Sequence, residues 1–198
     1  MSKQIADILL QYFPENYIGT IVEAGGGHPV DLSISAHFRD LGWKIITIEP
    51  NPDFCEEYRK KNIDVLEYAV CDEDKGVVRF KISPNAVSCS ALEIRYVNQK
   101  KGMGWTDEQF QTINVEAFTL NTILKKHHPE VRHIDILIVD TEGWELEVLS
   151  GLDFEKYNPD VMCIENFQNS ELYEPYMQQK GYVLSQRFEH DEFYIKLK

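Results

Sequence analysis

The chain has 198 residues, of which 43% are hydrophobic and 27% are charged, and its formal net charge is −13. These values are typical of one globular domain whose core is large enough to fold without disulfides, so we interpret residues 1–198 as a single domain. The negative charge argues against nucleic acid as a partner, because phosphate binding needs clustered lysine and arginine. No apolar run approaches the roughly 20 residues that span a bilayer, so we expect no membrane partner either.

The four cysteines are widely spaced and form no C-x-x-C pair. This pattern indicates free thiols in a reducing compartment rather than a disulfide framework or a zinc site. Residues 1–12 have helical apolar spacing, so we interpret them as a helix and not as a leader peptide. Together these features predict a soluble cytoplasmic protein.

The first half of the chain alternates apolar runs with amphipathic stretches. After the first helix, the pattern predicts strands at residues 20–22, 44–48 and 64–70, and helices at residues 30–41 and 51–61. Alternation of strand and helix favours an α/β fold with a parallel, doubly wound sheet and helices on both faces.

In the second half, residues 76–82 alternate and predict an extra strand on the edge of the sheet. Residues 83–112 have no periodicity, and we favour a functional lid over disorder for this irregular insert. The remaining predicted elements are a helix at residues 119–126, a strand at 134–139, a helix at 142–149, a strand at 161–164, a helix at 171–180 and an antiparallel hairpin at 182–198. The acids of the last helix and hairpin, among them Asp191 and Glu192, are expected on solvated faces.

A glycine-rich turn, Gly25-Gly26-Gly27, follows the strand that ends at Glu23, and Glu49 closes the next strand. Glycines at a turn that follows a strand let the backbone approach a ligand closely. A carboxylate at the end of the next strand can accept hydrogen bonds from the two hydroxyls of a ribose. The sequence therefore predicts a cradle for a nucleoside cofactor.

Two features favour S-adenosylmethionine over NAD as that cofactor. The dinucleotide motif G-x-G-x-x-G requires a glycine or alanine at its third position, and counting from Gly25 and Gly27 places Val30 there. In addition, the second half of the chain closes with a hairpin, whereas a dinucleotide-binding domain has two similar parallel halves.

Four segments carry a family resemblance: V-E-A-G-G-G, I-E-P-N-P, A-V-C-D-E-D-K-G and I-D-I-L-I-V-D-T-E-G-W-E-L-E-V-L-S-G. Together they resemble the FkbM family of class I S-adenosylmethionine-dependent methyltransferases over residues 21–167. The resemblance implies a Rossmann-like, seven-stranded sheet with an antiparallel last strand. It also implies an O-methyltransferase that acts on sugar or polyketide hydroxyls.

The same resemblance implies a set of cofactor contacts. The methionine end of the cofactor would meet Glu23, Gly25 and Gly27, the ribose would meet Glu49 with Pro50 and Asn51 beside it, and the adenine edge would meet Val70.

Asp140 and Glu142 are the candidate catalytic residues. Ligands of open α/β sheets bind beyond the carboxyl ends of the strands, where Asp140 follows a dense apolar strand. Methyl transfer to an alcohol needs a base or a metal, because a neutral hydroxyl is a poor nucleophile. The alternatives are a helix N-cap for Asp140 and a first-turn acid for Glu142. We favour the functional role for Asp140 and leave both roles open for Glu142.

A magnesium site is a further hypothesis. Asp140 and the Glu165-Asn166 pair end two successive sheet strands, and they resemble the trio with which catechol-type O-methyltransferases hold Mg²⁺. Carboxylate and amide oxygens suit this ion. In the alternative, Asn166 only ends its strand and Glu165 contacts substrate or backbone.

The sequence thus predicts an S-adenosylmethionine-dependent O-methyltransferase whose partner is a small-molecule or glycan acceptor, such as a carbohydrate hydroxyl. Two alternatives stay open. One is an NAD-dependent or nucleotide-sugar oxidoreductase on a related fold, and the other is a cofactor-binding subunit without catalysis.

Overall fold

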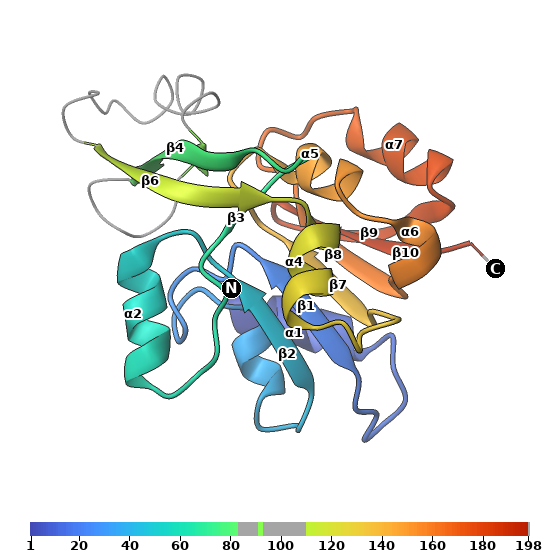
Figure 1. The fold of residues 1–198 in the computed structure, drawn as a ribbon. Coiled ribbons are helices and arrows are strands. Elements are labelled where there is room, and N and C mark those ends of the chain that lie inside the picture. The colour runs from blue at the N-terminus through green and yellow to red at the C-terminus, as the bar shows by residue number, and fades with distance from the viewer. Residues whose placement is uncertain (83–90, 93–109, 198) are drawn as a thin grey trace.

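A computed structural model of the chain describes residues 1–82, 91–92 and 110–197 (Figure 1). The described helices are α1 (Ser2–Leu10), α2 (Pro52–Lys60), α4 (Leu120–His127), α5 (Glu145–Ser150), α6 (Phe154–Tyr157) and α7 (Tyr173–Gln179), together with a 3-10 helix, η1 (Ser35–Phe38). The described strands are β1 (Thr20–Ala24), β2 (Lys44–Ile48), β3 (Ala69–Val70), β4 (Gly76–Ile82), β5 (Ala91–Leu92), β6 (Gln111–Phe118), β7 (Ile136–Val139), β8 (Val161–Glu165), β9 (Tyr182–Phe188) and β10 (Asp191–Lys196).

The main sheet has the strand order β2-β1-β7-β8-β10-β9. Strands β2, β1, β7 and β8 are parallel, and β10 runs antiparallel to both of its neighbours. The predicted α/β class and the C-terminal hairpin are therefore confirmed. Strands covered on both faces consist of continuous apolar runs, and every residue of β7 is buried.

Within the described residues the main sheet has six strands, where seven were predicted. At the place of the seventh, Leu66 makes a single parallel bridge to Ile48. The chain then leaves the main sheet, and Ala69 and Val70 pair with β6 instead. The strand predicted at residues 64–70 is therefore divided between two sheets.

The second sheet has the order β3-β6-β4-β5. Strand β4 pairs with β6 along its whole length, from Gly76 opposite Ala117 to Ile82 opposite Gln111, so its predicted place on the edge of the main sheet is wrong. Strand β6 was not predicted, although its apolar and polar residues alternate. The predicted irregular insert overlaps β5 and the start of β6, and the proposed lid otherwise lies outside the described residues.

Both faces of the main sheet are covered, as predicted. On one face, α1 and η1 contribute Leu9 and Phe38 to a core with Ile21 and Ile138 of the sheet. On the other face, helices α4, α5 and α7 and the second sheet form a larger core around Leu137. Figure 1 shows β4 and β6 lying beyond one end of the main sheet, near α5.

The helix predicted at residues 30–41 is wrong, since the structure has only the short 3-10 helix η1 there. The carboxylate of Glu23 accepts the backbone N–H groups of Ile34 and Ser35 at 2.7 and 3.0 Å. It also accepts the hydroxyls of Ser33 and Ser35 at 2.8 and 2.6 Å. Side-chain acceptors and serine hydroxyls compete with helical hydrogen bonds, and here a buried acid takes the amide hydrogens that a helix would use.

Cys55, Cys71 and Cys163 are buried free thiols, as predicted, and Cys89 lies outside the described residues. Among the described helices, none has the length and apolar character needed to cross a membrane.

Candidate functional site

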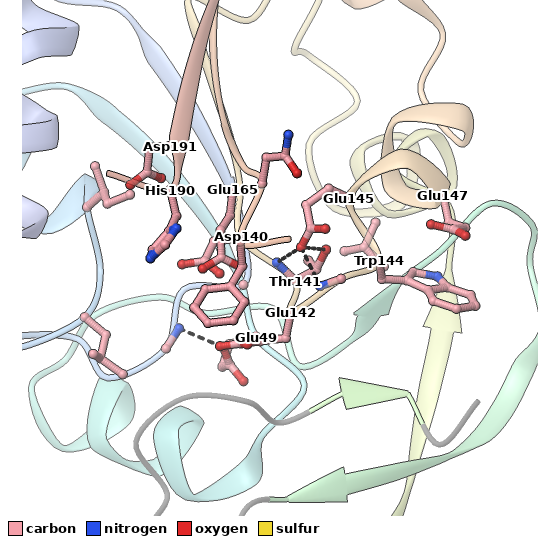
Figure 2. Close-up of a pocket in the computed structure, with 18 of the residues that line it drawn as sticks. Glu49, Asp140, Thr141, Glu142, Trp144, Glu145, Glu147, Glu165, His190 and Asp191 are labelled. Atoms are coloured by element: carbon pink, nitrogen blue, oxygen red, sulfur yellow. Dashed lines mark hydrogen bonds between the residues drawn. The ribbon is translucent and has the colours of Figure 1, made fainter. Parts of the chain in front are cut away.

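The carboxyl ends of β1, β2, β7 and β8 open onto a cavity of about 820 Å³ (Figure 2). This volume is typical of a pocket for a cofactor or a small molecule, and the position is the one at which open α/β sheets bind ligands. Residues that end or follow these strands form much of the polar lining, namely Gly25, Gly27, Glu49, Asp140, Thr141, Glu142, Glu165 and Asn166.

Gly25 begins the turn after β1, and its φ is +86°. A Cβ atom at this position would lie 1.7 Å from the carbonyl oxygen of Asp140. The N–H of Asp140 in turn donates to the carbonyl of Ala24 at 3.0 Å. The glycine turn and the loop after β7 are therefore in direct backbone contact, which only a residue without a side chain allows.

Glu49, immediately after β2, holds the far side of the same turn. One carboxylate oxygen accepts the N–H of Gly27 and the other accepts the N–H of Asn51, each at 2.7 Å. Burial raises the pKa of Glu49 to about 7, although both hydrogen bonds lower it. Each carboxylate oxygen can accept two hydrogen bonds, so Glu49 retains the capacity to accept two neighbouring hydroxyls of a ligand.

Asp140 follows β7 and Glu165 ends the neighbouring parallel strand β8, and their side chains lie side by side in the cavity (Figure 2). Burial raises the pKa of Asp140 well above its ordinary value and that of Glu165 to about 8. The negative charges of Glu142, Glu145 and Asp191 raise both pKa values further. The cavity therefore contains a pair of carboxyl groups that holds a proton near neutral pH.

Glu145, the first residue of α5, orders the loop that follows β7. One carboxylate oxygen accepts the N–H groups of Thr141 and Gly143 at 3.0 and 2.9 Å, and the other accepts the hydroxyl of Tyr173 at 2.8 Å. Its side chain is 1% exposed, so these hydrogen bonds are made away from water. Figure 2 shows the dashed contacts from Glu145 to the loop.

The helix predicted from residue 142 begins three residues later, at Glu145. Glu142 and Gly143 have φ values of +57° and +92°, which lie in the left-handed region. Trp144 occupies the N-cap position, so the alternative interpretations of Asp140 as an N-cap and of Glu142 as a first-turn acid are both wrong. Both acids line the cavity instead.

The sequence profile of the methyltransferase FkbM domain matches residues 23–184. The chain belongs to the FkbM methyltransferase family. The family predicted from the four sequence segments is thus confirmed, and family membership implies S-adenosylmethionine as the methyl donor.

Two relatives place this FkbM chain among known proteins. It is 28% identical to Methyltransferase sdnD of Sordaria araneosa over 138 residues, which cover 58% of this chain and 53% of that protein. Its fold is similar to the crystal structure of Methyltransferase FkbM from Methylobacillus flagellatus KT, with a TM-score of 0.50 and 13% identity over 90% of this chain and 44% of the other. The chain thus spans about half the length of each relative.

The FkbM cavity brings together most of the residues predicted to contact the cofactor, namely Gly25, Gly27, Glu49, Pro50 and Val70. Glu23 and Asn51 do not line it. The carboxylate of Glu23 faces the loop before η1, and the side chain of Asn51 accepts the N–H of Asp53 as the N-cap of α2. The aromatic lining residues Phe54 and Tyr68, which the sequence analysis did not single out, lie on the same cavity.

The predicted magnesium trio is not supported, because Asn166 is engaged elsewhere. Its amide nitrogen donates to the carbonyl of Ser170 and to Glu192, both at 3.0 Å. Its amide oxygen accepts the N–H of Ser170 at 2.8 Å. Asn166 is 3% exposed, and these hydrogen bonds fix the loop after β8.

Two acids predicted to be solvated belong to the interior. Asp191 and Glu192 are 7% and 4% exposed, and Asp191 lines the cavity together with His190. Strand β10 pairs with β8 so that Asp191 lies directly opposite Glu165. This cross-strand register, which the sequence does not reveal, adds a further acid to the FkbM site.

Proposed function

We propose that the chain is an S-adenosylmethionine-dependent O-methyltransferase that acts on a hydroxyl of a carbohydrate or another small metabolite. Family membership supports methyl transfer. The observation that carries the proposal is that the glycine turn, Glu49 and the Asp140–Glu165 pair open onto one cavity. A carboxylate that can bind a ribose and a candidate catalytic base therefore line one cavity, which a methyl donor and a small substrate would fill together.

The donor would extend across the ends of β1 and β2. Its methionine end would lie at the turn between Gly25 and Gly27, where close backbone approach is possible, and its ribose would bind Glu49. The adenine would rest against Val70, and the aromatic residue Tyr68 also lines the cavity. Aromatic and apolar side chains are suited to the faces of a nucleobase.

Asp140 would act as the base, with Glu142 beside it. The acceptor oxygen forms a bond to the methyl carbon while the C–S electron pair returns to sulfur, and the hydroxyl proton passes to the carboxylate. A base works best when its pKa lies near the working pH, and burial moves the pKa of Asp140 upward. Positioning of donor and acceptor supplies much of the remaining rate.

Isothermal titration calorimetry tests the donor. We expect binding of S-adenosylmethionine and none of NADH, and we expect Glu49→Ala to weaken donor binding by about 10- to 100-fold, because hydrogen bonds to a charged group are worth about 1.5–3 kcal/mol. Glu56→Ala, which removes an exposed acid from α2, is the matched control and is expected to bind normally. Binding of NADH without S-adenosylmethionine would favour the oxidoreductase alternative.

A further inference from the structure

The donor cavity is lined by acids from several separate parts of the chain, including Asp31 after the glycine turn and Glu145 and Glu147 of α5. Glu49 follows β2, Asp140 and Glu142 follow β7, Glu165 ends β8, and Asp191 begins β10. Among the described lining residues there is no lysine or arginine. His190 and the amino group of Met1 are the lining groups there that can carry positive charge. Figure 2 shows Asp140 and Glu165 side by side, with Glu49 and Asp191 around them.

The proximity of the Asp140 and Glu165 carboxyl groups restricts how many of them can be ionised. Two carboxylates offer only acceptors, so two of them side by side repel each other unless one holds a proton. The pair is half-buried at the ends of adjacent parallel strands, where two like charges repel each other more strongly than they would in bulk water. Without a ligand, the pair therefore carries one shared proton and one negative charge.

The methyl donor and its product differ in charge at a single atom. S-adenosylmethionine has a positive sulfonium, whereas the sulfur of S-adenosylhomocysteine is neutral, and apart from this charge the product lacks only the transferred methyl group. In the proposed function this sulfur lies at the Gly25 turn, which is in direct backbone contact with Asp140. The charge that disappears during the reaction would therefore lie close to the start of the loop that carries Asp140.

We propose that the protonation of the Asp140–Glu165 pair depends on the charge of the sulfur, so that the site binds S-adenosylmethionine more tightly than S-adenosylhomocysteine. This inference rests on the proposed function. When the cationic donor binds, the pair releases its shared proton to solvent. During transfer the C–S electron pair returns to sulfur, and the acceptor's hydroxyl proton passes to the pair. The product then lies in a site that has regained its proton and lost the attraction to a cation, which favours product release.

The test compares three ligands by calorimetry at pH 7 in two buffers of different ionisation enthalpy. S-adenosylmethionine is expected to release up to one proton and to bind about tenfold or more tightly than S-adenosylhomocysteine, which corresponds to about 1.4 kcal/mol. Sinefungin, in which a protonated amine replaces the methylsulfonium, is expected to behave like the donor. Equal affinities of donor and product, with equal proton release, would overturn the inference while leaving the proposed function intact.

The Glu165→Gln variant tests whether the preference for S-adenosylmethionine and the proton release depend on the pair. This variant is expected to lower the ratio of donor to product affinity toward one and to abolish proton release, with the affinity for S-adenosylhomocysteine little changed. Glu171→Gln makes the same change of charge at an exposed residue outside the cavity lining and is expected to match the parent protein. Proton release that persists in Glu165→Gln would overturn the inference, and absence of S-adenosylmethionine binding to the folded parent protein would overturn it together with the proposed function.

Discussion

At the scale of single residues, Gly25 has the strictest requirement. A side chain there would both clash with the Asp140 carbonyl at 1.7 Å and occupy a φ of +86°. We expect Gly25→Ala to lower the free energy of unfolding by about 3 kcal/mol or more, since overpacking and left-handed strain add. Measurement by urea unfolding checks this, and loss of the soluble folded protein agrees with it.

Gly76→Ala separates the two causes. Gly76 has a φ of +67°, but a Cβ atom there would meet nothing within 4 Å among the described residues. Only conformational strain remains, so this variant is expected to lose about 1–2 kcal/mol. Equal losses in the two glycine variants would contradict the close contact between the turn and Asp140.

Glu23 and Glu49 were both predicted to contact the cofactor, and only Glu49 lines the cavity. The family resemblance implies a cofactor contact for both acids, and Glu49 is also expected there because it closes the strand that follows the glycine turn. Successive residues of a strand face opposite sides of the sheet; Val22 and Ala24 belong to one core, and Ile21 to the other. Glu23 therefore shares the side of Ile21 and meets the loop before η1. The position of Glu49 follows from its place at the end of a strand. The position of Glu23 depends on which side of the sheet its side chain faces.

At the scale of elements, the loop between β7 and α5 depends on a contact from a distant helix. Tyr173 of α7 donates to Glu145, whose other oxygen holds Thr141 and Gly143. We expect Tyr173→Phe to destabilise the protein by about 1–3 kcal/mol, because a buried charge loses a donor. Amide hydrogen exchange at Thr141 and Gly143 is expected to accelerate about tenfold if 1.4 kcal/mol of this loss falls on the loop.

The matched control is on the same helix. The hydroxyl of Tyr176 is buried and has no hydrogen-bond partner among the described residues. Tyr176→Phe is therefore expected to leave hydrogen exchange in the loop unchanged and stability equal or slightly higher. Faster exchange in Tyr176→Phe than in Tyr173→Phe would show that α7 supports the loop by packing and not through Glu145.

Elements with strong local signals were predictable, and elements set by tertiary contacts were not. The runs that became β2 and β7 were predicted because strands covered on both faces are continuously apolar. The helix at residues 30–41 failed because a buried carboxylate from β1 takes its amide hydrogens. Strand β6 has an alternating pattern of its own, but the sequence does not show that β4 would pair with it across the insert.

At the scale of the whole molecule, the buried acids make stability depend on pH. Burial raises the pKa of Asp191 to about 6, of Glu49 to about 7 and of Glu165 to about 8, whereas unfolded carboxyl groups ionise near pH 4. Between these limits the folded state binds more protons than the unfolded state, so its stability falls as pH rises. The net charge of −13 acts in the same direction through self-repulsion.

We therefore expect the unliganded protein to be less stable at pH 8 than at pH 5.5, by on the order of 2 kcal/mol or more. Urea unfolding at constant ionic strength measures this difference. Glu165→Gln is expected to reduce the dependence on pH, because it removes one of the cavity acids whose pKa is raised, and Glu171→Gln is expected to keep it. Stability that rises across this interval would contradict the buried, protonated state of the cavity acids.

The pairing of β4 with β6 has an evolutionary consequence. Ile82 and Gln111 are cross-strand neighbours, so the sheet joins the two ends of the intervening segment, and Phe80, two residues before it, lines the cavity. Doubling the length of a flexible loop costs only about 0.6 kcal/mol. Insertions and deletions between these two anchor points can thus change the length of the chain while the pairing of β4 with β6 and the parallel strands of the main sheet stay intact.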